Sequence, residues 1–153
     1  MHPRKIASFA LAAAAAALAA GASACGEDTT PSRADFTAQA NELCRSANAK
    51  IAALPEPSDV DGLKHYIEQM TSVTSAAVDR FARLDPPAEL RNDVEAYVAN
   101  GRRVVALADR LADATLSGDQ TALKALQAEG DRLDADSDER AANMGLTDCA
   151  RDA

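Results

Sequence analysis

The chain has 153 residues and a formal net charge of −8, with 24 acidic against 16 basic side chains. So acidic a surface repels nucleic acid and anionic lipid head groups, and neither is expected as a partner. Tryptophan is absent, aromatic residues make up 3% of the chain and alanine is abundant, which favours helices over a β-sandwich or a barrel.

The first 24 residues have the order of parts of an export signal. Arg4 and Lys5 precede an apolar run rich in alanine and leucine, residues 6–20, and small residues close it. The run is shorter than the ~20 residues that span a bilayer, so we expect a cleaved signal peptide over residues 1–24. A retained N-terminal anchor is the alternative, and both place the rest of the chain outside the cytoplasm. Without Arg4 and Lys5 the remaining 129 residues carry a formal charge of −10.

Cys25 directly follows this segment, within the stretch Gly-Ala-Ser-Ala-Cys-Gly of residues 21–26. The stretch resembles a bacterial lipobox, in which a cysteine after small residues receives a diacylglyceryl group before cleavage. A lipobox prefers leucine three residues before the cysteine, where this chain has Ala22. Small residues here also fit an ordinary signal-peptidase site, which would leave a secreted protein with a free thiol. Lipidation of Cys25 leaves an even pair among three cysteines, so we prefer the lipid anchor.

A short polar linker, residues 25–32, starts at the anchor cysteine and leads to the first expected helix. This helix is predicted over residues 33–54, because apolar residues recur there at steps of three and four. Ser32 with Asp35 has the spacing of a capping box at its start. The apolar face comprises Phe36, Ala40, Leu43, Ala47, Ile51 and Leu54.

The second helix is predicted over residues 59–84, with Ser58 and Asp61 as its capping box. Gly62 in its first turn is expected to weaken the start slightly. Its apolar face comprises Leu63, Tyr66, Ile67, Met70, Val73, Ala77, Phe81 and Leu84.

The third helix is predicted over residues 86–116. Asp85 would be its N-cap, with the following two prolines in the first turn, where their missing N–H groups cost nothing. Asn100-Gly101 is a turn signal, but the apolar register passes through it unbroken. We therefore expect one long helix with a weak point at Gly101.

The fourth helix is predicted over residues 120–144, between two glycine signals. Gly118 is expected in the left-handed conformation that ends a helix, and Asp119 as the N-cap of the next one. Gly145 is a matching C-cap, after which Leu146 can fold back over the last turn.

Four amphipathic helices joined by short turns predict an all-α domain over residues 33–153, arranged as an up-down-up-down four-helix bundle. The fourth helix would then run beside the first, so that its end approaches the N-terminal half of the first helix, where Cys44 is expected. Cys149 lies just past helix 4, and export permits oxidation. We therefore predict a Cys44–Cys149 disulfide, with two buried free thiols as the alternative.

Candidate catalytic and metal sites are few. Asp134, Asp136 and Asp138 copy the opening of a calcium loop, but Glu139 and Gly145 stand where glycine and glutamate are needed. A solvated acidic helix face is the preferred interpretation. Within the expected mature chain the only histidine is His65, and it has no partner at ligand spacing, so it is expected at or near the surface. No metal, haem, nucleotide or serine-nucleophile motif is present, so neither a cofactor nor enzyme activity is expected.

Tyr66 and Tyr97 fall on inner helix faces, where core packing is the default role. Together with Gly101 they could instead flank a small ligand pocket between helices.

Several of these elements together resemble a group of small actinobacterial lipoproteins. The resemblance implies the lipid anchor and the cysteine pair, and it implies no activity or ligand. It rests on Cys25, Phe36-x-x-x-Ala40-Asn41-x-x-Cys44, Leu84-x-Pro86-Pro87, Gly118-Asp119 and Gly145-Leu146-x-x-Cys149.

The function expected from the sequence is that of a non-enzymatic lipoprotein on the outer side of a cell membrane. Its acyl chains would hold it there, and it would engage another protein of the cell envelope. The alternative function is binding or sensing of a small molecule in a pocket between helices.

Overall fold

The computed structural model describes residues 31–150, and this part of the chain contains helices and no strand. The prediction of an all-helical domain with four main helices is therefore confirmed. The predicted signal peptide, Cys25 and most of the linker lie outside the described residues. The helices are α1 (Arg33–Ala52), α2 (Val60–Phe81), the short 3₁₀ helix η1 (Ala88–Leu90), α3 (Arg91–Ser117) and α4 (Gln120–Met144).

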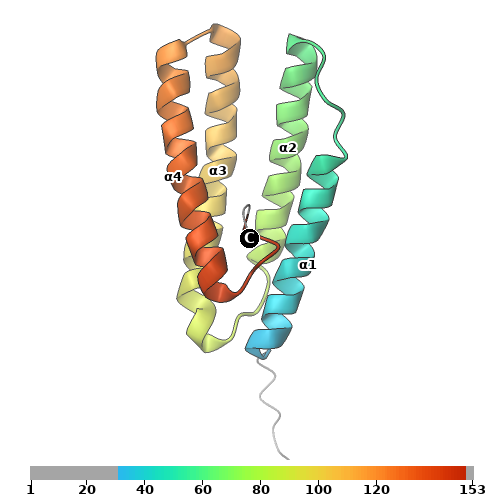
Figure 1. Cartoon of the computed structure of the whole chain (residues 1–153), viewed down its shortest axis with the longest axis vertical. Coiled ribbons are helices and arrows are strands. Elements are labelled where there is room, and N and C mark those ends of the chain that lie inside the picture. Colours follow the sequence, from blue (N-terminus) through green and yellow to red (C-terminus); the bar gives the residue numbers. More distant parts are fainter. Residues whose placement is uncertain (1–30, 151–153) are drawn as a thin grey trace, which may run out of the picture.

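The helices form two hairpins that lie next to each other (Figure 1). Residues 53–59 connect α1 to α2, and residues 118–119 connect α3 to α4, both at the upper end of the figure. Residues 82–90 join the two hairpins at the lower end, where α1 also begins. Below, "upper end" and "lower end" have these meanings.

Helix contacts run from α1 to α2, from α2 to α3 and from α3 to α4, and α1 has no extended contact with α4. The expectation that helix 1 lies directly beside helix 4 is therefore wrong. Residues beyond α4 lie between these two helices instead (Figure 1). This side of the array, where α1 and α4 have no extended contact, is called the groove below.

The main hydrophobic core lies toward the lower end and draws on every helix. Phe36 of α1 meets Phe81 of α2 edge-to-face, with ring centroids 6.1 Å apart. The ring of Phe81 lies 4.9 Å from that of Tyr97 on α3. The buried members of this core are Phe36, Ala40, Phe81, Leu90, Val94, Val98, Ala141, Met144 and Leu146.

A second, smaller core lies between α3 and α4 alone. Its buried residues are Leu107, Ala114 and Leu126. Neither α1 nor α2 contributes to it, so the two hairpins share one core only toward the lower end.

The α2–α3 contact depends on a glycine. A Cβ atom added at Gly101 would lie 2.7 Å from Cγ2 of Val78, closer than real Cβ contacts. Gly101 therefore lets α3 approach α2 at this height, and α3 continues through it without a break, as predicted.

A side-chain oxygen caps the N-terminus of both α1 and α2, but the cap of α2 lies one residue later than predicted. The hydroxyl of Ser32 accepts a hydrogen bond from the Asp35 amide at 3.2 Å, as predicted. Helix α2, however, is capped by Asp59 and not by Ser58: the Asp59 carboxylate accepts from the Gly62 amide at 2.6 Å. An ionised carboxylate is the better acceptor at the positive end of a helix. Gly62 leaves the room that this carboxylate occupies, with 3.0 Å to an added Cβ.

The start of the third helix was predicted too early. Pro87 is extended, with φ −60° and ψ 154°, and precedes η1, while α3 begins at Arg91. A residue before proline is disfavoured in the α conformation, and Pro86 stands before Pro87. The two prolines are therefore excluded from the helix, and Asp85 is not its N-cap.

The two glycine C-caps are confirmed. Gly118 has φ 69° and ends α3, and Gly145 has φ 78° and ends α4. Asp119 then caps α4 with hydrogen bonds from the amides of Thr121 and Ala122. The observed bounds of α4 are the predicted ones.

Candidate functional site

The C-terminal segment, residues 145–150, crosses from the end of α4 to the side of α1 (Figure 1). Its turn is set by Gly145, after which the Leu146 amide donates to the Ala141 carbonyl at 2.8 Å. The Leu146 side chain is completely buried in the main core. The segment therefore fills, toward the lower end, the space between α1 and α4.

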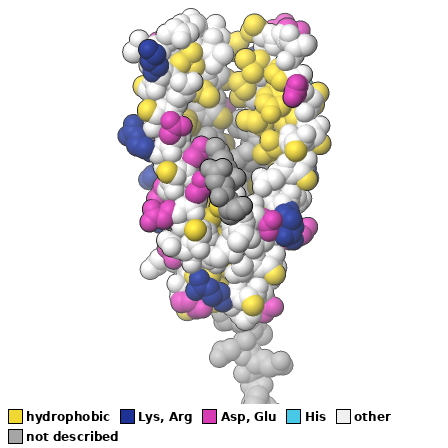
Figure 2. Space-filling model, viewed as in Figure 1, with side chains coloured by type: hydrophobic (Ala, Val, Ile, Leu, Met, Phe, Trp, Pro, Cys, Tyr) yellow, Lys and Arg dark blue, Asp and Glu magenta, His cyan; other side chains and the backbone are white. Residues whose placement is uncertain are grey.

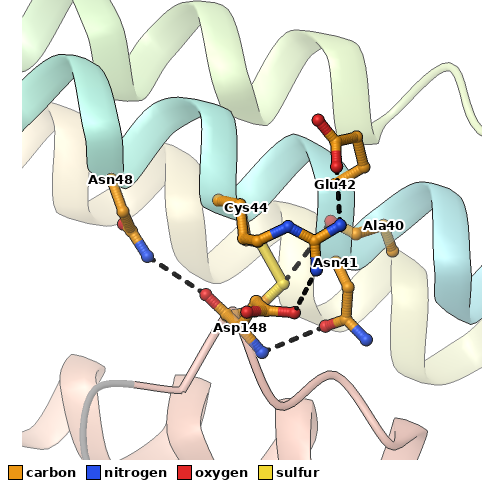
Figure 3. Close-up of polar contacts among 8 residues, drawn as sticks. Ala40, Asn41, Glu42, Cys44, Asn48 and Asp148 are labelled. Atoms are coloured by element: carbon orange, nitrogen blue, oxygen red, sulfur yellow. Dashed lines mark hydrogen bonds and ion pairs between the residues drawn. A yellow bond between two sulfur atoms is a disulfide. The ribbon is translucent and has the colours of Figure 1, made fainter.

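Hydrogen bonds hold this segment along about two turns of α1 (Figure 3). Asn41 accepts from the Asp148 amide at 3.1 Å, and the Asn48 side chain donates to the Asp148 carbonyl at 3.1 Å. The Asp148 carboxylate pairs with Arg45 at 2.8 Å. The hydrogen bond with Glu42, reinforced by the charge of Asp148, raises the pKa of the Arg45 guanidinium above its ordinary value.

A disulfide joins Cys44 to Cys149 and closes this arrangement covalently, as predicted from the sequence (Figure 3). The Cα atoms are 5.1 Å apart, within the range that a disulfide bridges without moving the backbone. The prediction placed Cys44 too close to the start of α1: it is the twelfth residue of twenty, past the middle of the helix. The C-terminal segment reaches Cys44 because it continues up α1 from the lower end. There Arg33 donates a hydrogen bond to the Asn143 carbonyl at 2.9 Å.

Above the main core all four helices and Cys149 surround a cavity of about 230 Å³, called the central cavity below. Tyr97 and Gly101 line it, as the pocket hypothesis required. Tyr66 does not: it lies eight residues before the nearest lining residue of α2, or about 12 Å along the helix. The lining residues are Leu43, Cys44, Ala47, Asn48, Ile51, Thr74, Ala77, Val78, Phe81, Tyr97, Gly101, Val104, Asp134, Ser137, Asp138 and Cys149.

The acidic run of α4 is divided between two faces. Asp134 and Asp138 are half-buried and line the central cavity, so for these two the expected solvated face is wrong. Asp136 instead accepts a hydrogen bond from Arg140 at 2.9 Å, which lowers the pKa of its carboxyl. All three lie within the continuous helix α4, so the sequence copy of a calcium loop does not fold as a loop.

The wall between α3 and α4 contains one buried polar side chain, that of Asn100, which is 2% exposed. Its amide group donates to the Leu133 carbonyl and to the hydroxyl of Ser137, both at 2.7 Å. Its carbonyl oxygen has no hydrogen-bond partner among the described residues. Ser137 lines the central cavity, so this polar group stands directly behind the cavity wall.

The apolar face of α2 above the cavity is only partly covered. Phe81 is the one buried residue of this helix, and the residues of the upper apolar face are only half-buried. Figure 2 shows hydrophobic side chains gathering over the upper part of α2, and acidic side chains over α4 across the groove. The exposed large hydrophobic residues, Val60 and Leu116, also belong to the upper end, where α2 begins and α3 ends. The half-buried residues are Leu63, Tyr66, Ile67, Met70 and Val73.

His65 is on the outer side of α2, with its side chain 68% exposed and Nδ1 4.0 Å from the Glu68 carboxylate. Within residues 31–150 no three histidine, cysteine or acidic side chains come together as a metal-binding group. No helix of this described part is long and apolar enough to cross a membrane.

The sequence did not single out Asp134 and Asp138 as cavity residues, although a signal was present. They are four residues apart, and each directly follows a residue of the inner face, Leu133 or Ser137. Asp134 and Asp138 also precede the buried Ala141 by seven and three residues. The helical period therefore places all three on one face of α4, the face toward the groove.

No family model, curated protein or solved structure matches the chain. Its function therefore follows from the chemistry and the geometry of the groove and the central cavity.

Proposed function

We propose that this chain is a non-enzymatic lipoprotein tethered to the outer side of a cell membrane through Cys25, and that its groove binds another protein of the cell envelope. The fold that serves this function is an up-down-up-down bundle left open between its first and last helices. The observation that carries the proposal is the partly covered apolar face of α2 at the upper end.

The position of the tether supports an outward-facing groove. Cys25 is eight residues before Arg33, and α1 begins at the lower end (Figure 1). Helix α1 has 20 residues and is about 30 Å long, so the upper end stands at least that far from the tether point of the domain. A lipid-held domain would then present its exposed hydrophobic residues away from its own membrane.

The chemistry of the upper end supports a protein as the partner. Val60 is 64% exposed and Leu116 is 50% exposed, and both lie at the upper end, as does the half-buried row of α2. Apolar side chains exposed in one region of a protein are typical of interaction sites. An amphipathic helix of a partner could bury it in the way that a helix fills an apolar groove.

Site-specific photo-crosslinking in intact cells tests this proposal. A photoreactive benzoylphenylalanine in place of Ile67 is expected to yield one discrete protein adduct, because Ile67 lies on the partly covered apolar face of α2. The matched control carries the same group in place of His65, two residues away on the exposed side of α2. We expect no adduct from position 65, and loss of the position-67 adduct when Cys25→Ser removes the tether. Equal adducts at both positions, or none at either, would contradict the proposal.

A second function, small-molecule binding, is favoured by the central cavity. It is formed jointly by all four helices and includes Tyr97 and Gly101. Ligand pockets in helical bundles occur at such places, lined by apolar side chains with a few polar groups. The two functions use different heights of the same groove and do not exclude each other.

A further inference from the structure

A second cavity, of about 170 Å³, lies along the seam between α1 and α2 and is called the outer cavity below. Leu43, Ala47 and Ala77 line both this cavity and the central one, so these three residues form the wall between them. The outer cavity therefore opens on the side of the seam that is turned away from the central cavity. It is left unfilled because alanine side chains of both helices end at Cβ here.

Two basic side chains line the outer cavity, Lys50 of α1 and Arg80 of α2, and none of its lining residues is acidic. Neither basic side chain takes part in an ion pair among residues 31–150. Asp79, directly before Arg80, does not line the cavity. Glu42 and Glu68, the acidic neighbours one turn away, already pair with other basic side chains. The cavity thus carries positive charge that no described side chain neutralises.

The antiparallel course of α1 and α2 directs the two cations toward each other (Figure 1). Side chains on a helix lean toward its N-terminus. Lys50 stands in the last turn of α1 and leans toward the lower end, whereas Arg80 stands in the last turn of α2 and leans toward the upper end. One positive charge therefore approaches the outer cavity from each of its ends.

Two serine hydroxyls line the cavity between these charges, Ser46 on α1 and Ser72 on α2. The contact between Phe36 and Phe81 aligns the two helices. Ser46 comes ten residues after Phe36 and Ser72 nine residues before Phe81, so both serines stand about 14–15 Å above this contact. Neither hydroxyl takes part in a hydrogen bond within residues 31–150. Both can therefore donate to a ligand.

Four donor groups from two helices favour a tetrahedral oxyanion. The guanidinium of Arg80 presents its N–H groups in a fork that matches phosphate, and the ammonium of Lys50 binds phosphate as a point charge. The two hydroxyls add donors from the sides. A phosphate group offers more acceptor oxygens, in more directions, than a planar carboxylate, so it can bind all four donors.

The size of the outer cavity suits a small ligand. Its volume of about 170 Å³ equals that of roughly five or six water molecules at ~30 Å³ each, which is the size of a phosphate group with a short carbon stem. Leu43, Val73 and Ala77 supply apolar surface for that stem.

We propose that the outer cavity binds a phosphate group, held at its two ends by Lys50 and Arg80 and at its sides by the hydroxyls of Ser46 and Ser72. This site goes beyond the function proposed above and does not depend on it, because it lies apart from the groove and the central cavity. The same chemistry has two sources, a soluble phosphate ester or the head group of a phospholipid. The acidic surface of the domain disfavours approach to an anionic bilayer, so the experiment must separate the two.

Titration of the oxidised Cys25→Ser protein with methyl phosphate tests the site, with trimethyl phosphate as the uncharged comparison. Binding is read from the backbone amide shifts of Ser46 and Ser72. Methyl phosphate is expected to bind about tenfold more tightly than trimethyl phosphate, and Lys50→Gln or Arg80→Gln to weaken its binding about tenfold. Both substituted side chains are exposed, so the fold should be kept.

Two further variants separate the cavity from general charge. Ala76 is exposed and lines the outer cavity, so Ala76→Leu fills it without changing any charge and is expected to abolish binding. Arg83→Gln is the matched control, because Arg83 is exposed, stands three residues after Arg80 and does not line the cavity. It is expected to change the affinity by less than about twofold, since solvent screens charges outside the site.

Vesicles of phosphatidylcholine with and without phosphatidylglycerol distinguish the two sources, because the Cys25→Ser protein lacks the acyl chains that would bind vesicles directly. Sedimentation with the phosphatidylglycerol vesicles that is lost in Arg80→Gln and in Ala76→Leu supports a lipid head group as the ligand. Methyl phosphate binding without such sedimentation supports a soluble phosphate ester. The inference is overturned if methyl phosphate binds no more tightly than trimethyl phosphate, or if Arg80→Gln and Ala76→Leu bind it as well as the parent protein.

Discussion

Replacing Cys44 and Cys149 together by serine is expected to lower the free energy of unfolding by about 3–5 kcal/mol. The disulfide closes a loop of 105 residues, and cross-links over loops of this length restrict the unfolded chain most strongly. It also holds the C-terminal segment against α1, where that segment fills the space between α1 and α4. Urea unfolding followed by circular dichroism measures the change.

Reduction of the wild-type disulfide provides the control for this experiment. Wild-type protein in reductant is expected to match the double-serine variant, and the variant itself should not respond to reductant. Hydrogen exchange should accelerate in α1 more than in α4, because α4 keeps its long contact with α3. Unchanged stability on loss of the disulfide would show that the C-terminal segment holds its place through packing alone.

Leu146→Ala is expected to cost about 2–5 kcal/mol of unfolding free energy. The Leu146 side chain is fully buried in the main core, between the end of α4 and α1, so its removal leaves a cavity. The backbone turn at Gly145 should persist, because its hydrogen bond to Ala141 does not involve the side chain. Thermal and urea unfolding both report the loss.

Leu116→Ala is the matched control for this substitution. It removes the same atoms from a side chain that is 50% exposed at the upper end, so a change within about 0.5 kcal/mol is expected. Equal losses at positions 116 and 146 would contradict the placement of Leu146 in the core. When Leu146→Ala is combined with the double-serine variant, the total loss of unfolding free energy should be smaller than the sum of the two losses, since both changes act on the same segment.

The local features of this fold could be predicted because each depends on a few neighbouring residues. Gly118 and Asp119 end one helix and begin another through backbone conformation and a side-chain cap, and the structure agrees. The same holds for the stop at Gly145. The error at Pro86-Pro87 was also local, because the second proline disfavours the α conformation of the first.

The openness of the array could not be predicted in this way. Periodicity identifies the apolar face of α2 but does not say which helix covers it. The structure leaves Leu63, Ile67 and Met70 half-buried because α1 and α4 stand apart at this height. A closed bundle and an open array therefore share one sequence pattern, and only the tertiary contacts distinguish them.

In the candidate site, too, features set within one helix could be predicted, and features set by the packing of helices could not. Tyr97 and Gly101 line the same cavity because both lie on one helix, at a spacing that puts them on a common face. Tyr66 lies on another helix, and its height relative to Tyr97 depends on how α2 and α3 are aligned. The contribution of Asp134 and Asp138 was missed because the run of charges resembled a solvated face.

A native mass spectrum of the protein extracted from its own membrane tests the central claim, that a lipid tether holds a disulfide-closed binding domain outside the cell membrane. The expected mass is that of a chain that begins at Cys25 and carries a diacylglyceryl group, less the hydrogens lost on forming one disulfide. Additional non-covalent mass is expected while the groove or the central cavity is filled. A chain without lipid, or one that retains residues 1–24, would contradict the tether.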